Sequence, residues 1–441
     1  MKYEMNLFDK NNIEKAIKAN SSINKKELFY ILLNSNLDFG KENNVISRHG
    51  WHSFPAKFPP ALPKLFIENL TQINDVILDP MSGSCTTLLE SVYLNRKGYG
   101  FDIDPLSLMI GKAKLQNINK LEIKEIGNSI LNRAYKVFIY NKNDLEKELV
   151  SRFDKETFDF LNFWYSKESQ LELISLILQI EKIENQKAKE FLQLIFSSII
   201  ITKSGGVTLS YDLAHTRPHK VKNKTINSAF IEFNKKITKI LNNGYIDLPE
   251  NFELNEGNAK QLSLPDNSVD LIVTSPPYAN NAIDYMRAHK FSLIWFNFSI
   301  NELKNTRKKF IGAESLIKGN IKQLPELTCS IVSNFKKINI SKGNSVERYY
   351  SEIQQVISEM YRVLKPQRAC VIVVASSILN GIDIRIDKCF KELGEHAGFE
   401  LVHIGERNIQ RDKRMMPISR NSIKLQIENR MHKEFVIGFW K

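Results

Sequence analysis

One short segment constrains the fold of this chain more than any other, because strand, turn, helix and strand patterns follow one another without interruption. Residues 75–79 (DVILD) form an apolar run typical of a buried strand, and residues 80–85 (PMSGSC) form a turn of small residues. A helical stretch, TTLLESVYLN, follows, and residues 98–102 (GYGFD) then read as a second strand that ends in an acid. This order is that of a βαβ unit, so we predict an α/β fold built on a parallel sheet.

Further strands and a long helical block complete the predicted architecture. Residues 268–274 (SVDLIVT) and 368–375 (RACVIVVA) read as buried strands, and residues 400–410 and 433–441 as a terminal antiparallel hairpin. Residues from about 115 to 245 instead show apolar residues at helical spacing. This block is too long for a crossover connection, so we predict a helical insertion.

The charge balance favours an anionic partner. The 441 residues include 62 Lys and Arg against 49 Asp and Glu, a net charge of +13. The excess lies mainly in three segments, 201–240, 301–350 and 401–441. If these segments share one face, they form the electrostatic footprint of a polyanion, whereas each alone is also explained by a solvated helix face.

The sequence also argues against several classes of protein. No apolar window approaches the about eighteen residues of a membrane span, and the first residues lack the apolar core of a signal peptide. The cysteines are far apart and show no ligand spacing: Cys85, Cys329, Cys370 and Cys389. We therefore expect a cytoplasmic protein with no membrane partner and no metal.

Two motifs at predicted strand ends carry the functional prediction. Residues 79–87 read DPMSGSCTT, and residues 274–278 read TSPPY. At these residues the chain resembles the DNA amino-methyltransferases that use S-adenosylmethionine and modify cytosine N4 or adenine N6. Their cofactor loop usually reads Asp-Pro-Phe-x-Gly-Ser-Gly-Thr, so Met81 and Cys85 depart from the pattern. The resemblance implies a Rossmann-like, three-layer class I methyltransferase fold with a mostly parallel seven-stranded sheet.

The first motif is the predicted cofactor loop. Gly83 allows the backbone to approach a ligand closely, and the amides that open the next helix offer partial positive charge to the methionine carboxylate. Asp102 is placed to accept hydrogen bonds from two ribose hydroxyls, and Ile103 to pack against the adenine. A phosphate-binding or dinucleotide-binding turn is the alternative, although the loop has neither a GxGxxG pattern nor a Walker lysine. The cofactor residues predicted from the two motifs and from the end of the second strand are Asp79, Pro80, Ser82, Gly83, Ser84, Thr86, Thr87, Asp102, Ile103 and Thr274.

The second motif is the predicted catalytic loop. An exocyclic amine is a poor nucleophile until its lone pair is localised on the nitrogen. Groups that accept hydrogen bonds from its N–H groups localise the lone pair. The Ser275 side chain and the Pro276 carbonyl supply two acceptors, Pro277 stiffens the loop, and Tyr278 offers a flat face to an extruded base. A proline-rich docking segment is the alternative interpretation. No Pro-Cys dipeptide is present, which argues against the cytosine C5 route and its nucleophilic cysteine.

Other segments add weaker candidates. The segment 49–60 resembles the part of the family that packs over the methionine end of the cofactor, with Phe54, Lys57 and Phe58 at matching positions; an ordinary aromatic loop is the alternative. Asn258, after Glu256 and Gly257, resembles the family's contact with the adenine amino group, although a plain turn is nearly as good an explanation. Candidate contacts with DNA are Arg217, Lys220, Arg287, Arg411 and Arg414.

In family terms, residues 1–48 form an N-terminal helical segment, 49–115 the cofactor-binding half, 116–248 a helical insertion that is a candidate for target recognition, and 249–441 the catalytic half with a basic insertion at about 300–350. The expected activity is methylation of double-stranded DNA at cytosine N4, because a serine precedes the prolines, within a restriction-modification or phage-defence system with a possible cognate endonuclease. Three alternatives stay open: adenine N6 in DNA, an amine in RNA, and a DNA-binding protein with a decayed cofactor site.

Overall fold

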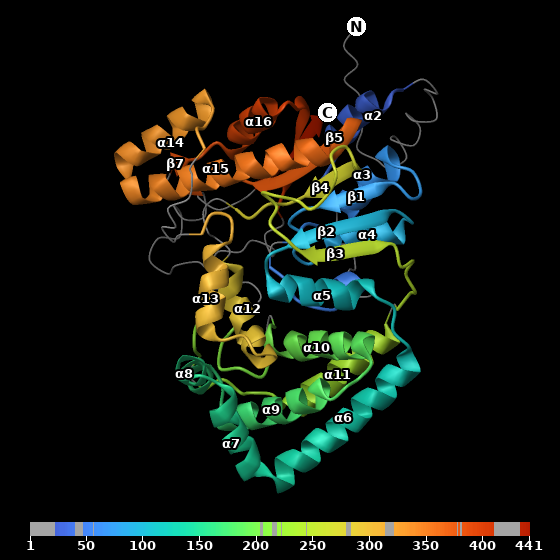
Figure 1. The fold of residues 1–441 in the computed structure, drawn as a ribbon, viewed down its shortest axis with the longest axis vertical. Helices are drawn as coiled ribbons and strands as arrows, with labels where there is room; N and C mark the ends of the chain where they lie inside the picture. The colour runs from blue at the N-terminus through green and yellow to red at the C-terminus, as the bar shows by residue number, and fades with distance from the viewer. Residues whose placement is uncertain are drawn as a thin grey trace.

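The computed structural model describes residues 23–39, 47–55, 57–202, 206–213, 218–221, 223–243, 245–278, 284–313, 322–376, 378–379, 382–409 and 433–441. Its centre is a seven-stranded sheet in the order β3-β2-β1-β4-β5-β9-β8 (Figure 1). The strands are β1 (Val76–Asp79), β2 (Lys97–Asp102), β3 (Phe252–Glu256), β4 (Val269–Thr274), β5 (Leu364–Ala375), β8 (Glu400–Asn408) and β9 (Lys433–Trp440). The five strands β1–β5 pair in parallel, whereas β9 is antiparallel to both of its neighbours. The fold is therefore a Rossmann-like class I methyltransferase fold.

Helices cover both faces of the sheet, and the side chains of the strands alternate between the two cores. Ile77 packs into the core that includes α2 (Lys25–Leu33) and α3 (Ala61–Leu70), while the next residue, Leu78, packs into the opposite core. That opposite core is formed with α14 (Glu326–Ile338), α15 (Ile340–Val363) and α16 (Ile386–Ala397). The result is the predicted arrangement of three layers.

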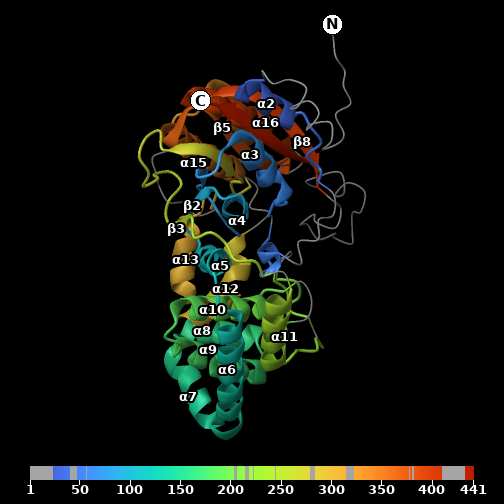
Figure 2. The ribbon, with the colours of Figure 1, turned by 90° about the vertical axis from the view of Figure 1, so that its right-hand side faces the viewer.

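The block between β2 and β3 is helical and lies at one end of the molecule. It follows α5 (Pro105–Leu115), and Figures 1 and 2 show it as a separate lobe below the sheet. Its helices are α6 (Lys120–Tyr140), α7 (Lys142–Arg152), α8 (Lys155–Trp164), α9 (Lys167–Glu181), α10 (Gln186–Ile200) and α11 (Ala229–Asn242). Between lobe and sheet lie α12 (Tyr285–Leu293) and α13 (Ile300–Lys308) (Figure 1).

Two features of the fold are absent from the sequence-based prediction. The edge strand β3 has the sequence FELNE, in which only Leu254 is buried, so neither alternation nor an apolar run indicated it. The segment 300–350, predicted as a basic insertion, contains α13, α14 and the first half of α15.

Within the described ranges no helix is long and apolar enough to cross a membrane, and no group of His, Cys, Asp and Glu is arranged to hold a metal ion.

Candidate cofactor and catalytic site

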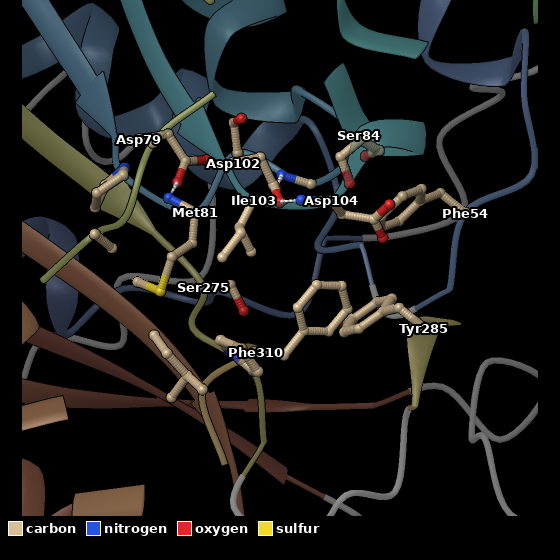
Figure 3. Close-up of a pocket in the computed structure, with 18 of the residues that line it drawn as sticks. Phe54, Asp79, Met81, Ser84, Asp102, Ile103, Asp104, Ser275, Tyr285 and Phe310 are labelled. Carbon is tan, nitrogen blue, oxygen red and sulfur yellow. Dashed lines mark hydrogen bonds between the residues drawn. The ribbon is translucent and has the colours of Figure 1, made fainter. Parts of the chain in front are cut away.

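A cavity lies at the carboxyl ends of the central parallel strands. β1 has β2 on one side and β4 on the other, so the strand order reverses at β1, where α/β sheets usually bind their ligands. The cavity holds about 890 Å³ of empty space, including the part open to solvent. Figure 3 shows Ser275 between the strand-end residues Asp79 and Asp102 on one side and Phe310 on the other. The site therefore joins both predicted motifs in one pocket.

Most residues predicted to bind the cofactor line this cavity. They come from the loop after β1, the end of β2, the turn after β3 and the aromatic segment before α3. The lining residues of this group are Phe54, Lys57, Phe58, Asp79, Pro80, Ser82, Gly83, Ser84, Thr86, Asp102, Ile103 and Asn258.

The loop between β1 and α4 (Thr86–Tyr93) is tied to the end of β2. The Ser82 amide and hydroxyl both donate to the Phe101 carbonyl, at 2.9 and 3.1 Å, and the Gly83 amide donates to Asp102 Oδ2 at 2.7 Å. Gly83 has φ +48°, a conformation that side chains other than glycine rarely adopt, and a Cβ there would lie 3.4 Å from the Phe54 ring. These hydrogen bonds fix the loop in an extended turn that lines the cavity.

Cys85 replaces a family glycine and keeps the backbone conformation that glycine favours. It precedes α4 with φ 60° and ψ 37°, in the left-handed region. Its side chain fills space that Gly111 of α5 leaves, because a Cβ on Gly111 would lie 2.4 Å from Cys85 Sγ. Burial raises the pKa of the thiol to about 12, so it stays protonated and inert near neutral pH. Cys85 is therefore a packing residue.

Asp102 presents a carboxylate suited to the ribose of S-adenosylmethionine. Its Oδ1 accepts the Asp104 amide at 2.9 Å and its Oδ2 accepts the Gly83 amide, which fixes the group at the cavity wall. Each carboxylate oxygen has a second lone pair, so both can also accept a hydroxyl. Burial, followed by the nearby Asp104 carboxylate, raises the pKa of Asp102 to about 7. Together with the apolar surface of Ile103, these two acceptor oxygens fit the adenosine part of the cofactor.

A buried lysine lies beneath the same loop. Lys114 has no exposed surface, and its Nζ donates to the Ser84 carbonyl at 3.1 Å. Burial, followed by repulsion from Lys57, lowers the pKa of Lys114 to about 7. Positive potential from this amine adds to that of the helix amides, so the loop suits the methionine carboxylate.

Two predicted cofactor residues lie behind the cavity instead of lining it. Thr274 donates to Asp79 Oδ1 at 2.7 Å, and Thr87 donates to the Val273 carbonyl at 3.0 Å. Both hydroxyls join β1 and α4 to β4, so they hold the two motifs together. Burial raises the pKa of Asp79 to about 6 although Thr274 and the Met81 amide donate to it.

The catalytic tetrapeptide is divided between cavity and interior. Ser275 and Pro277 line the cavity. The Tyr278 side chain is 9% exposed, and its hydroxyl donates to Glu434 Oε1 of β9 at 3.1 Å. Burial and the Glu434 carboxylate raise the pKa of Tyr278 well above its ordinary value. The ring is therefore held by the terminal hairpin, a contact that the sequence did not predict.

The aromatic segment before α3 closes one end of the cavity. Lys57 donates to the His49 carbonyl at 2.8 Å, and His49 Nε2 lies 2.7 Å from the Glu90 carboxylate of α4. The Phe54 ring packs on Tyr285 and His289 of α12, with centroid distances of 5.6 and 5.1 Å. The segment is thus anchored to α4 on one side and to α12 on the other.

Several cavity residues were missed by the sequence analysis. Asp104 joins the cavity to α12, since its Oδ2 lies 2.5 Å from His289 Nδ1. The segment after α13 forms a further wall, held there because Glu352 of α15 accepts the Gly312 amide at 2.9 Å. No motif marks Asp104 or the segment after α13, whereas Met81 lies within the first motif and Gly257 next to Asn258. The missed lining residues are Met81, Asp104, Ser107, Gly257, Ala259, Tyr285, Lys309, Phe310 and Ile311.

The predicted contacts with DNA lie outside the cavity or outside the described residues. Lys220 is exposed, and its Nζ lies 4.8 Å from the centre of the Phe163 ring. Arg287 of α12 is paired with Asp284 at 2.8 Å. The other three, Arg217, Arg411 and Arg414, lie outside the described residues.

Comparisons with known proteins agree with this geometry. The family described as DNA methylase, the N6 and N4 enzymes, matches residues 2–112 and 269–431. The type II methyltransferase M.MvaI of Kocuria varians is 26% identical over 404 residues, which cover 82% of this chain and 85% of that protein. The type II methyltransferase M.BsoBI of Geobacillus stearothermophilus is 23% identical over 467 residues, 91% of this chain and 89% of that protein.

A solved SAM-dependent methyltransferase from Methanosarcina mazei covers 85% of this chain and 96% of its own, with 11% identity and a TM-score of 0.32. The family match includes both strand-end motifs that meet at the cavity. S-adenosylmethionine is the cofactor of this family, and the residues around the cavity fit it. The chain belongs to the DNA methylase family of amino-methyltransferases that act on N6 or N4.

Proposed function

We propose that this protein methylates the exocyclic N4 of cytosine in double-stranded DNA, and that it is the modification enzyme of a restriction-modification system. The observation that carries the proposal is that Ser275 and Pro277 line the same cavity as the cofactor loop. A serine at the first position of the tetrapeptide, in place of Asp or Asn, favours cytosine over adenine. The relatives named above are type II methyltransferases, which supports the restriction-modification role and a cytoplasmic location.

The chain's own residues would prepare the amine. The Ser275 hydroxyl and the Pro276 carbonyl accept hydrogen bonds from its two N–H groups, which localises the nitrogen lone pair for attack on the methyl carbon. The Tyr278 ring is proposed to stack on the extruded base. Asp102 holds the ribose and the loop amides hold the methionine carboxylate, so the reactants meet in a fixed geometry. When bound, S-adenosylmethionine would supply the methyl group from its positively charged sulfur and leave as the neutral thioether, while the amine gives up one proton to solvent.

Target recognition is proposed to lie in the helical insertion, 116–248. Helix α10 packs against α5 and α12 (Figure 1), and these two helices carry the cavity residues Ser107 and Tyr285. Two aromatic side chains on the lobe, Phe163 and Tyr211, are exposed. The Phe163 ring lies near the Lys220 ammonium, and the Tyr211 ring near the His219 ring. Aromatic rings beside basic residues are common on nucleic-acid-binding surfaces.

The proposal is tested by incubating the purified protein with S-adenosylmethionine and unmethylated plasmid DNA, then analysing the digested nucleosides by mass spectrometry. N4-methyldeoxycytidine is the expected product. N6-methyldeoxyadenosine would contradict the base assignment while keeping amino methylation. Product only on an RNA substrate offered in parallel, or no product with intact cofactor binding, would contradict the proposed function itself.

A further inference from the structure

We infer that Glu434 and Arg407 of the terminal hairpin are positioning residues, which hold the Tyr278 ring in its place in the catalytic loop. The inference rests on the proposed function, since Tyr278 has a role only if the loop acts on a base. It concerns residues to which neither motif assigns a role, and Glu434 lies outside the segments matched by the family.

The three side chains form one buried network. Tyr278, Arg407 and Glu434 are 9%, 8% and 7% exposed. The Tyr278 hydroxyl donates to Glu434 Oε1 at 3.1 Å, and Arg407 Nη1 donates to Glu434 Oε2. Arg407 and Glu434 are also direct neighbours in the pairing of β8 with β9. Both oxygens of the carboxylate are therefore satisfied, one of them by the tyrosine.

The network is anchored beyond the hairpin. Arg407 Nε donates to the Leu37 carbonyl, at 3.1 Å, in the segment after α2. Glu434 faces Ala375 at the end of β5, next to the end of β4 from which the catalytic loop leaves. The hydroxyl of Tyr278 thus connects the loop to rigid elements on two sides.

The chemistry explains why a hydroxyl is useful at this position. Stacking on a base needs only an aromatic ring, which phenylalanine also supplies. A buried carboxylate needs its hydrogen bonds, because an unmade bond leaves a desolvated charge. The pair of Glu434 with the Tyr278 hydroxyl therefore fixes the ring orientation in a way that phenylalanine cannot.

The test is a double-mutant cycle with Tyr278→Phe, Glu434→Gln and the combined variant. Single-turnover methylation is measured with tritiated S-adenosylmethionine and unmethylated plasmid DNA, and cofactor affinity by calorimetry. Tyr350→Phe and Asp270→Asn are matched controls: Tyr350 donates to the Ile384 carbonyl at 3.0 Å, and Asp270 accepts the Val76 amide at 3.0 Å, both in buried sites outside the cavity.

We expect Tyr278→Phe to lower the single-turnover rate about tenfold, because a loop displaced by a fraction of an ångström loses alignment. Glu434→Gln should lower it less, and should add little in the Tyr278→Phe background. Cofactor affinity and both controls should match the wild type within twofold.

A Tyr278→Phe variant as fast as the wild type, or two single effects that add fully, would overturn the inference while leaving the proposed function intact. If Glu434→Gln fails to fold, as judged by thermal unfolding, the Tyr278→Phe rate decides alone. An inactive wild type that binds cofactor would overturn the proposed function instead.

Discussion

The two halves of the candidate site are held in different ways. On the cofactor side, the loop after β1 is fixed by bonds to Phe101 and Asp102, which follow it by about twenty residues. On the catalytic side, Tyr278 is fixed by Glu434, which lies 156 positions away in the chain. The cofactor half is thus specified by a local βαβ unit, whereas the catalytic half depends on the terminal hairpin. Substitutions that separate cofactor binding from methyl transfer sharpen this comparison.

The largest effect is expected for Tyr278→Ala. Losing the ring removes the proposed stacking face and leaves Glu434 Oε1 without its donor, so single-turnover methylation should fall by about 100-fold or more. Cofactor affinity by calorimetry should stay nearly unchanged, because the cofactor loop is held independently. Unchanged turnover would remove Tyr278 from the catalytic loop's function.

Asp102→Ala should act in the opposite half. The loss of the acceptor for the ribose hydroxyls should weaken S-adenosylmethionine binding by about 1–3 kcal/mol, measured by calorimetry. At saturating cofactor the methylation rate should recover much of its wild-type value. A rate defect that persists at saturation would mean that the halves are not separable.

The same carboxyl predicts a pH dependence. The pKa of Asp102 is raised to about 7, and hydroxyl donors favour its ionised form. Cofactor binding should therefore release a proton from Asp102 near neutral pH, and this contribution makes affinity rise from pH 6 to pH 8. Lys114, whose pKa is also about 7, contributes in the opposite sense over the same range, so the wild-type profile is compared with that of Asp102→Asn. Asp102→Asn should bind more weakly and should lose the rise that Asp102 contributes. An affinity that falls with rising pH in the wild type, but not in the variant, would contradict this role.

Gly111→Ala tests the packing beneath the cofactor loop. The new Cβ would lie 2.4 Å from Cys85 Sγ and 2.4 Å from a methyl group of Leu254, so the free energy of unfolding should fall by about 1–3 kcal/mol. Cys85→Gly in the same chain should recover part of the loss in chemical denaturation, since it removes one of the two clashing groups. No recovery would indicate that Leu254 alone limits the space.

The smallest effect is expected for Lys220→Ala on the helical insertion. A single exposed cation near DNA contributes modestly, so DNA affinity should fall only a few-fold and its salt dependence should weaken slightly. Cofactor affinity should not change. An unaltered salt dependence would place Lys220 away from the DNA.

The sequence predicted those parts of the site that depend on local pattern. The apolar strand, the small-residue turn and the acid at 102 define the cofactor loop, and the structure brings them together with Ser275 and Pro277. The sequence predicted this strand as buried but not how its side chains divide; Ile77 and Leu78 enter opposite cores because successive side chains of a strand point to opposite faces. The terminal hairpin was also predicted, and β8 and β9 pair as expected.

The remainder could not be predicted because it depends on contacts between distant segments. Glu434 and Arg407 look like ordinary polar positions of a terminal strand until the hairpin packs beside β5. Phe310 reaches the cavity in a segment that α15 holds: Glu352 accepts the Gly312 amide, and Arg348 donates to the Ala313 carbonyl. Thr274 and Thr87 stand within their motifs, but their hydroxyls turn toward Asp79 and the Val273 carbonyl.

The central claim is most directly tested by single-molecule sequencing of DNA from a methylation-free host that expresses this chain, with a Ser275→Ala strain as control. Sequencing of this kind reports the modified base and its sequence context together. The account predicts N4-methylcytosine within one short motif in the wild-type strain and a strong reduction in the control. N6-methyladenine in the motif, or a wild-type genome without modification despite a folded, cofactor-binding protein, would contradict it.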